Sequence, residues 1–400
     1  MKVGKISANI LKRSVLRQIH RRREEVVNGA GMGEDCAVFS FSGDTLTVSC
    51  VQEAALAVSA TAAEGSDDAR KAVLFGPEGS DDVRKAVLLG PEGSDDVRKA
   101  VLLGPEGSDD ARKAVLPKPE ESDSAGRTYP AEQRTMSRLI QKCANNLVAR
   151  GAEPTAVLIT LLLPEDLEEP DLKELMAEAE RTCDRLHMQI AGGQTRVTSA
   201  VTVPYGVVTG IGSIPEKGYK SLKAPAPGQD VVISKWIGLE GTACLAKLHR
   251  GKLLERYPSW LVEEAAGFDR FLSVIPEAAT AVKSGVCAMH DVSEGGIFGA
   301  LWELAEGAGV GLTIDLKKLP LRQETVEVCE YCNVNPYELL SGGCLLMTSE
   351  DGATLVSALE AEGIPAVAVG KVTDSKDRIL INEEEIRYMD RPKRDGIYGI

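Results

Sequence analysis

The chain has 400 residues, of which 43% are hydrophobic and 26% are charged, so it is long enough to bury the cores of two domains. Its formal charge of −14 argues against a nucleic-acid-binding or anionic-membrane surface. No apolar run approaches the roughly 20 residues needed to span a bilayer, and the basic N-terminus has no apolar signal core. These features predict a cytoplasmic protein.

Nine cysteines are scattered, mostly through apolar segments, where reduced cysteine packs as a small hydrophobic side chain. Cys329 and Cys332 form a close pair that is open to two interpretations, redox or metal chemistry and ordinary packing. Packing is favoured because no second pair or nearby histidine accompanies them. The four histidines do not cluster, so no histidine metal site is expected.

In chain order, residues 37–50 alternate around a Ser-Gly-Asp turn and predict a β-hairpin. Four nearly identical 14-residue units follow over residues 64–119. Each unit reads as a short helix with an N-cap serine, and we expect a surface insertion without catalytic chemistry, because solenoid units are longer. Residues 136–151 and 170–188 have helical periodicity, residues 156–165 and 201–212 predict strands, and Gly192–Thr195 predicts a turn.

This alternation predicts a mixed α/β sheet covered by helices. The proline-rich segment 223–230 suggests a boundary near residues 218–228, which gives domains 1–218 and 219–400. In the second domain we expect a strand at 230–235 and a glycine-rich turn into a helix over 237–248. Residues 286–316 predict strand, loop, helix and strand, and 339–349 a glycine turn entering a strand. Residues 363–372 are expected to close the sheet.

The order of GED, NNL with GAEP, GGQT, DVSEGG and SGG resembles the AIR synthase-related (PurM-like) superfamily over almost the whole chain apart from the repeats. Within it, the segments around NNL and DVSEGG are most similar to the hydrogenase maturation protein HypE. The resemblance implies a two-domain α+β fold whose N-terminal domains pair into a dimeric β-barrel. It also implies that ATP and Mg²⁺ bind in a cleft completed by a second subunit.

Carried over residue by residue, the resemblance assigns Asp35, beside Glu34, and Asp291 to the metal. It assigns the nucleotide to eight positions: Asn145, Gly192, Gly193, Gln194, Thr195, Ser293, Gly295 and Gly296. Glycine lets a backbone approach phosphate closely, and aspartate supplies the hard oxygen that Mg²⁺ prefers.

Several of the family's expected residues differ in this sequence. Neutral amides, Asn146 and Gln194, stand where the family has aspartates, and Ser49-Cys50-Val51 replaces a Thr-Asp. Ser341-Gly342-Gly343 replaces the family's Asn-Glu-Gly, and no cysteine lies near the C-terminus. Since an amide oxygen ligates Mg²⁺ without formal charge, a weak or altered metal site is expected.

Each motif also has a structural interpretation. Gly192–Thr195 could be a plain turn, Asp291 could N-cap a helix beginning near Ser293, and the helix start at Gly238–Thr242 could be capped without binding an anion. Arg138 and Lys142 share a helical face and could meet phosphate, although water is favoured.

Two functions follow. One is an ATP-dependent enzyme that activates an unknown acceptor by phosphoryl transfer, and the other is a non-catalytic nucleotide-binding or dimeric scaffold.

Overall fold

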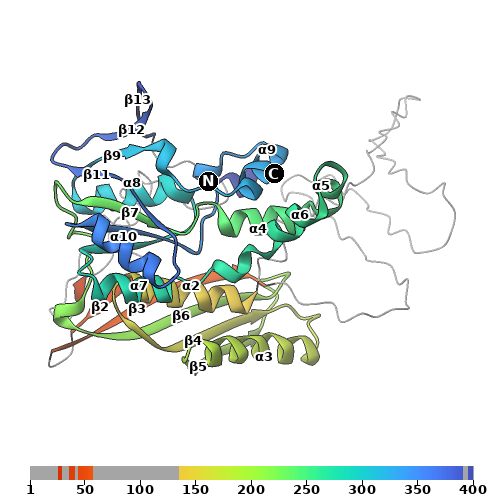
Figure 1. Cartoon of the computed structure of the whole chain (residues 1–400). Coiled ribbons are helices and arrows are strands. Elements are labelled where there is room, and N and C mark those ends of the chain that lie inside the picture. The colour runs from red at the N-terminus through yellow and green to blue at the C-terminus, as the bar shows by residue number, and fades with distance from the viewer. Residues whose placement is uncertain (1–25, 29–35, 41–43, 57–134, 391–394, 400) are drawn as a thin grey trace, which may run out of the picture. The chain divides into compact units, whose positions relative to one another are not determined.

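The structure is a computed structural model that describes residues 26–28, 36–40, 44–56, 135–390 and 395–399. Within these ranges the chain forms two β-sheets and nine α-helices (Figure 1), which confirms the predicted mixed α/β architecture. The repeats of residues 64–119, and Asp35, lie outside the described residues. None of the helices in the described ranges is long and apolar enough to cross a membrane.

The first sheet has the strand order β1-β2-β3-β6-β4-β5, and its neighbouring strands are antiparallel except for the pair β4 and β5. Its strands are β1 (Val26–Asn28), β2 (Cys36–Phe39), β3 (Thr45–Ala55), β4 (Glu153–Leu163), β5 (Gln189–Val197) and β6 (Tyr205–Pro215). The predicted hairpin is confirmed, since β2 pairs with β3.

Helices α2 (Met136–Ala149) and α3 (Glu169–Arg185) belong to the same half of the chain. Thr135 caps α2 by accepting a hydrogen bond from the Arg138 backbone N–H at 3.3 Å. Alternate residues of β3 and β4 are buried, so the sheet has a buried face and a more exposed one. Ile140, Cys143 and Leu147 of α2 are fully buried in the core with that face, where each large apolar side chain contributes roughly 1.5–3 kcal/mol.

The second sheet has the order β13-β12-β9-β11-β7-β10-β8, with β12 and β9 parallel and the other neighbouring strands antiparallel. Its strands are β7 (Asp230–Ser234), β8 (Ala288–Val292), β9 (Gly311–Asp315), β10 (Cys344–Ser349), β11 (Ala366–Thr373), β12 (Arg378–Asn382) and β13 (Glu385–Tyr388). Strand β8 is buried along its whole length. That pattern is typical of a strand covered on both faces.

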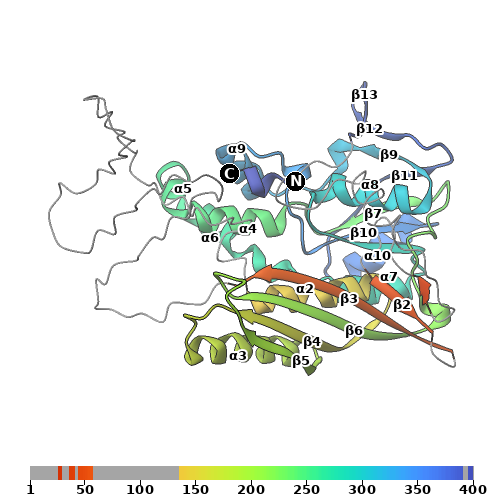
Figure 2. The same ribbon diagram turned by 180° about the vertical axis from the view of Figure 1, so that it is seen from behind.

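The remaining helices all belong to the second half of the chain. The α-helices are α4 (Leu239–Leu248), α5 (Arg250–Arg256), α6 (Ser259–Ala266), α7 (Ile275–Lys283), α8 (Gly296–Ala308), α9 (Gln323–Cys332) and α10 (Gly352–Ala361). The short 3-10 helices are η4 (Glu216–Gly218), η5 (Gly267–Phe271), η6 (Leu316–Lys318), η7 (Pro336–Glu338) and η8 (Gly396–Gly399). Helices α2 and α7 lie between the two sheets in both views (Figures 1 and 2), and α2 packs against β8 and α7.

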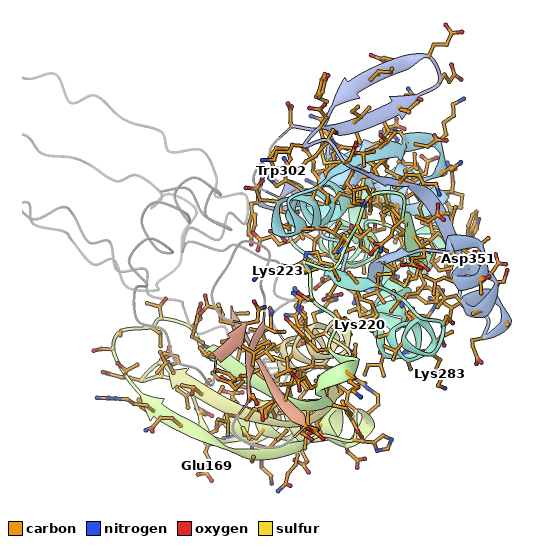
Figure 3. The ribbon with its side chains drawn as sticks, turned by 90° about the vertical axis from the view of Figure 1, so that its left-hand side faces the viewer. Glu169, Lys220, Lys223, Lys283, Trp302 and Asp351 are labelled. Carbon is orange, nitrogen blue, oxygen red and sulfur yellow. The ribbon has the colours of Figure 1, made fainter. Side chains whose placement is uncertain are left out.

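Residues 216–229 connect the two sheets. Lys220, labelled in Figure 3, anchors this connection to both halves of the chain. Its backbone N–H donates to the carbonyl of Arg150 at 3.0 Å, and its ammonium donates to the carbonyl of Val286 at 2.8 Å. The connection is therefore bonded to the end of α2 and to the segment that precedes β8.

Two predictions about local structure are wrong, one about a turn and one about the place of a strand in its sheet. Gly192–Thr195 does not form a turn but lies inside the edge strand β5, and residues 363–372 contribute β11, which pairs with β7 and β9 in the middle of its sheet. The conformation and surroundings of Gly193 explain why this segment is a strand and not a turn. A Cβ atom there would lie 1.8 Å from the carbonyl oxygen of Ile159, and its φ is +144°. Glycine is needed because β5 approaches β4 closely beside a bulge.

We expect Gly193→Ala to lower the free energy of unfolding by roughly 2–5 kcal/mol, because it adds backbone strain and a clash with β4. Gly251→Ala is the matched control, since Gly251 lies in α5 and a Cβ there meets no atom within 4 Å. Urea unfolding of both variants measures the difference. Equal stabilities would contradict the close approach of β5 to β4.

Candidate functional site

The turn between β8 and α8 carries three of the predicted nucleotide-binding residues. Gly295 is the N-cap of α8 with φ +88°, and Gly296 follows with φ +63°. A side chain at Gly296 would meet the carbonyl oxygen of Tyr337 at 2.5 Å. The carbonyl of Ser293 accepts hydrogen bonds from the N–H groups of Gly296 and Ser341. Backbone amides at such a helix start favour an anion.

The anion that this turn holds is a carboxylate of the same chain. The Gly295 N–H donates to Asp395 Oδ2 at 2.7 Å, while the N–H groups of Leu340 and Ile397 donate to Oδ1 at 3.3 and 3.0 Å. Asp395 is 3% exposed. Burial raises its pKa from 3.8 to about 6, although the three amides and their positive dipoles act in the opposite direction.

Asp291 lies in β8, beside this turn in sequence, and is 4% exposed. Its backbone is in register with Leu345 of β10. The alternative role as a helix N-cap is wrong, because α8 begins at Gly296 and its N-cap is Gly295. Asp291 therefore remains a carboxylate held inside the second sheet.

Gly192, Gly193, Gln194 and Thr195 all lie on β5 and are exposed. Gln194 is in register with Thr160 of β4, so its side chain points to the same face of the sheet as Thr160, away from α2. Strand β5 is an edge of the first sheet and β8 is an edge of the second. The two groups of predicted ligands thus belong to different sheets of this chain.

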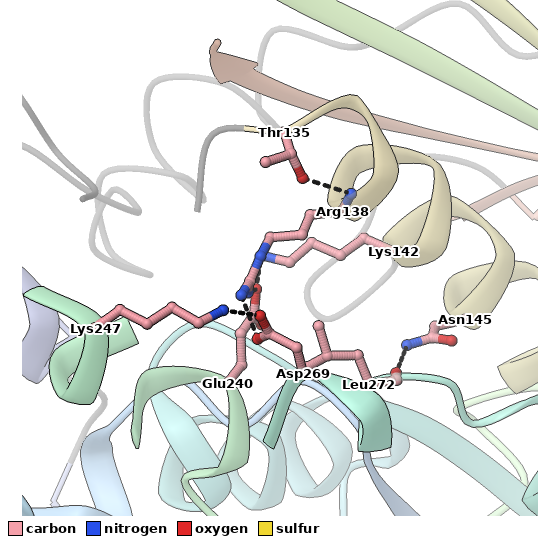
Figure 4. Close-up of polar contacts among 8 residues, drawn as sticks. All are labelled: Thr135, Arg138, Lys142, Asn145, Glu240, Lys247, Asp269 and Leu272. Atoms are coloured by element: carbon pink, nitrogen blue, oxygen red, sulfur yellow. Dashed lines mark hydrogen bonds and ion pairs between the residues drawn. The ribbon is translucent and has the colours of Figure 1, made fainter. Parts of the chain in front are cut away.

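Asn145 binds backbone groups of the second half of the chain. Its Nδ2 donates to the carbonyl of Leu272 at 2.8 Å (Figure 4), and its Oδ1 accepts from the Val274 N–H at 3.1 Å and from Gln141 Nε2 at 3.0 Å. Asn145 is 2% exposed. A buried amide with its hydrogen bonds formed fixes the position of its partners, so Asn145 joins α2 to the segment before α7.

A cluster of ion pairs lies one to two turns earlier on α2 (Figure 4). Arg138 and Lys142 both contact Glu240 of α4, at 3.2 and 3.1 Å, and Arg138 also contacts Asp269 of η5. Glu240 has a side chain that is 1% exposed. The expectation that Arg138 and Lys142 face water is wrong, because a buried carboxylate lies opposite them. Removing one partner of a buried ion pair of this kind destabilises the fold, because the other charge is left buried and unpaired.

The backbone N–H groups at the start of α4 donate hydrogen bonds to other residues of this chain. The Gly238 N–H donates to Ser341 Oγ at 2.7 Å, and the Gly241 N–H donates to the carbonyl of Leu340 at 2.8 Å. Thr242 donates to Thr325 Oγ1 at 3.1 Å. These bonds favour the interpretation of Gly238–Thr242 as a capped helix start.

The predicted metal site has few charged oxygen donors among the described residues. Among the side chains that the structure describes, no group of three or more His, Cys, Asp or Glu residues is arranged to hold a metal ion. Asp291 is the one member of the predicted metal pair within the described ranges, and Gln194 and Asn146 offer neutral oxygens. Mg²⁺ favours several charged oxygens, so these described donors do not fit a resident Mg²⁺.

The Cys329 and Cys332 pair lies at the end of α9, and all nine cysteines are free thiols. Burial raises the pKa of Cys329 to about 12 and that of Cys332 to about 11. Both thiols are protonated near neutral pH and are poor nucleophiles. The packing interpretation of this pair is favoured.

Comparison with known families matches the two halves of the chain separately. Residues 132–214 match the N-terminal domain of AIR synthase related protein, and residues 226–382 match its C-terminal domain. The chain belongs to the AIR synthase-related family.

Members of this family with similar sequences include carbamoyl dehydratase HypE of Rhodobacter capsulatus, which is 29% identical over 233 residues. That alignment covers 57% of this chain and 66%, about two thirds, of the relative. Among solved structures, hydrogenase maturation protein HypE in complex with ATP has a TM-score of 0.56 and 18% identity, covering 66% of this chain and 81% of the other. AaThiL complexed with AMPPCP and TMP has a TM-score of 0.60 and 17% identity, covering 99% and 98%. These structural likenesses show the shared fold.

Sequence reasoning missed Asp395, Asp269 and the cluster around Glu240. Asp395 is 100 residues from Gly295 in sequence, and Arg138 is 102 residues from Glu240. No local pattern links residues so far apart, because the contacts arise only when the two halves of the chain pack together.

We expect the stability of the wild type to depend on pH through Asp395. Because its folded pKa of about 6 lies above the reference value of 3.8, ionisation in the folded state is unfavourable. The stabilising contribution is fully present below pH 4 and is lost as pH rises through 6, at most roughly 3 kcal/mol. Thermal melts of wild type and Asp395→Asn between pH 4 and 8 should show the wild type gaining relative stability as pH falls. Parallel curves would contradict the raised pKa.

Proposed function

We propose that this protein binds ATP, with the β8–α8 turn contacting its phosphates. The observation that carries this proposal is the contact between the Gly295 N–H and the Asp395 carboxyl, because it supports this turn as a place where backbone amides receive acidic oxygens. A phosphate would take the position that the Asp395 side chain now holds. Two relatives of the same fold were solved with ATP or AMPPCP, which supports a nucleotide as the ligand.

The bound nucleotide would be positioned mainly by the chain's own amides. The N–H groups of Gly295, Leu340 and Ile397, which donate to Asp395 in this structure, would donate to phosphate oxygens instead. The buried Asp291 lies at the end of the preceding strand. The described donors do not fit a resident Mg²⁺, and Asp291 is the one described carboxylate of the predicted metal pair that would hold a cation bound together with ATP. Positioning of this kind would supply one part of what phosphoryl transfer to an in-line acceptor requires.

A second function, a non-catalytic nucleotide-binding scaffold, is favoured by a different observation. Gln194 and Asn146 are amides, and Asn145 has its side chain bound to Leu272, Val274 and Gln141. Gln194 and Asn146 therefore contribute less charge to a metal than the aspartates that the family resemblance places at those positions. Weak metal binding would leave nucleotide binding with little catalysis.

Calorimetric titration of ATP, with and without Mg²⁺, tests the proposal. We expect the wild type to bind ATP in both conditions, with an affinity gain from Mg²⁺ that Asp291→Ala removes. Asp395→Asn should bind ATP more tightly, by roughly tenfold, because it removes a negative charge that competes with phosphate. Absence of binding by folded protein in either condition would overturn the proposal. Binding that strictly requires Mg²⁺ and is lost in Asp291→Ala would instead refute the scaffold function.

We also propose that the protein forms a homodimer through the face of the first sheet that points away from α2. Val51 and Leu158 are both in register with Thr209, so the three side chains lie in one row on that face. Val51 is 55% exposed and Leu158 is 37% exposed. Gln194 points to the same face. Pairing with a second copy would cover these apolar side chains and bring a second Gln194 to the assembly.

Light scattering after size exclusion tests the dimer. We expect the wild type to have the mass of a dimer and Val51→Asp to have that of a monomer, because a charge would be buried without a partner. Val326→Asp is the matched control, since Val326 is an exposed valine of α9 on the second half of the chain. A monomeric wild type, or dissociation by both variants equally, would contradict this interface.

A further inference from the structure

A pocket of about 790 Å³ opens beside the first turns of α2. Its walls come from the start of α2, the end of α3, the end of α4, η5 and the segment that leads into α7. The eight positions predicted to bind the nucleotide do not line it. It is therefore a different site from the β8–α8 turn.

Cationic side chains outnumber carboxylates among the residues that line this pocket, in a protein whose formal charge is −14. Four cationic side chains line it, and Asp269 is the one carboxylate among the lining residues. The cations are Arg138, Arg185, Lys247 and Arg270. A concave surface with an excess of one charge raises the local concentration of ions of the opposite sign, so this pocket favours an anion.

An anionic ligand in this pocket would compete with the Asp269 carboxylate for the cations that contact it. Both Arg138 and Lys247 contact its carboxylate (Figure 4), and its side chain is 34% exposed at the pocket. Lys247 is 29% exposed, whereas Arg138 is 8% exposed and is also held by Glu240. The two cations are thus already set at a spacing that a carboxylate fits, and Lys247 is the more accessible of them.

Arg185 adds an exposed guanidinium to the lining of the pocket. It ends α3 and donates to Ser137 Oγ at 3.4 Å, a long hydrogen bond from an exposed guanidinium. Leu272 and Ile275 add half-buried apolar surface to the lining. Guanidinium groups match the geometry of phosphate oxygens, while the apolar side chains would contact the carbon skeleton of a ligand.

We propose that this pocket binds a small organic phosphate, with its phosphate between Arg185 and Lys247 and its carbon skeleton against Leu272 and Ile275. Asp269 weakens this binding by holding Lys247 in the free protein. The proposal is independent of ATP binding at the β8–α8 turn, because the two sites share none of their named residues.

Titration of inorganic pyrophosphate into the full chain at constant ionic strength tests the pocket. We expect Arg185→Ala and Lys247→Ala each to weaken binding about tenfold, as loss of a charged hydrogen bond does. Asp269→Asn should tighten binding several-fold. Arg181→Ala is the matched control. Arg181 lies one turn earlier on α3, pairs with Glu174 and does not line the pocket. The Arg181→Ala variant should therefore bind pyrophosphate as tightly as the wild type does.

Comparing the pyrophosphate affinities of the control and of the pocket variants decides whether pyrophosphate binds in this pocket. Weakening by Arg185→Ala and Lys247→Ala but not by Arg181→Ala supports the pocket. No binding by the folded wild type overturns the proposal, and so does binding that all three variants leave unchanged, since pyrophosphate would then lie elsewhere. Equal weakening by Arg181→Ala and Arg185→Ala would also overturn it, because the effect would then reflect general surface charge.

Discussion

The structure depends on helix α2 having one apolar side and one polar side that are both buried. Ile140, Cys143 and Leu147 pack in the core of the first sheet, while Arg138, Asn145 and Arg150 bind groups from the second half of the chain. Apolar contacts are tolerant of small displacements, whereas buried hydrogen bonds and ion pairs are not. The polar side of α2 therefore sets the register between α2 and the segments that carry Glu240, Leu272 and Met289. Both the β8–α8 turn and the basic pocket are built from segments next to these contacts.

A second feature is that carboxylates of the chain occupy places suited to an anionic ligand. Asp395 accepts three backbone N–H groups at the start of α8, Glu240 lies between Arg138 and Lys142, and Asp269 lies between Arg138 and Lys247. An internal carboxylate satisfies buried donors when no ligand is present, and it lowers the affinity of a ligand that must displace it. Glu240, at 1% side-chain exposure, is part of the fold, whereas Asp269 is open to exchange. Burial raises the pKa of Asp395, so ionisation of this carboxyl in the turn is unfavourable and its contribution to stability falls as pH rises.

The chemistry of the site follows from which charges are present. Asp291 is buried in β8, but the amides Asn146 and Gln194 bring no negative charge to a cation. Fewer carboxylates weaken a metal and at the same time lessen repulsion of a polyphosphate. These donors therefore favour weak over tight chelation of Mg²⁺. If two copies pair through the exposed face of the first sheet, the Gln194 side chains of both copies lie at that face.

The sequence by itself determined the alternation of strands and helices, the hairpin of β2 and β3, helix α2 and the family, because periodicity and glycine-rich motifs are local properties. It could not assign Gly193 to a strand. A sequence does not distinguish a glycine that permits a turn from one that permits β5 to approach Ile159 closely. Only the tertiary structure decided that Arg138 and Lys142 face Glu240, that Asn145 binds Leu272, and that Asp395 fills the α8 turn. Each of these contacts joins residues about 100 or more positions apart. Their energies depend on burial and on partners, and both exist only once the two halves of the chain have packed against α2.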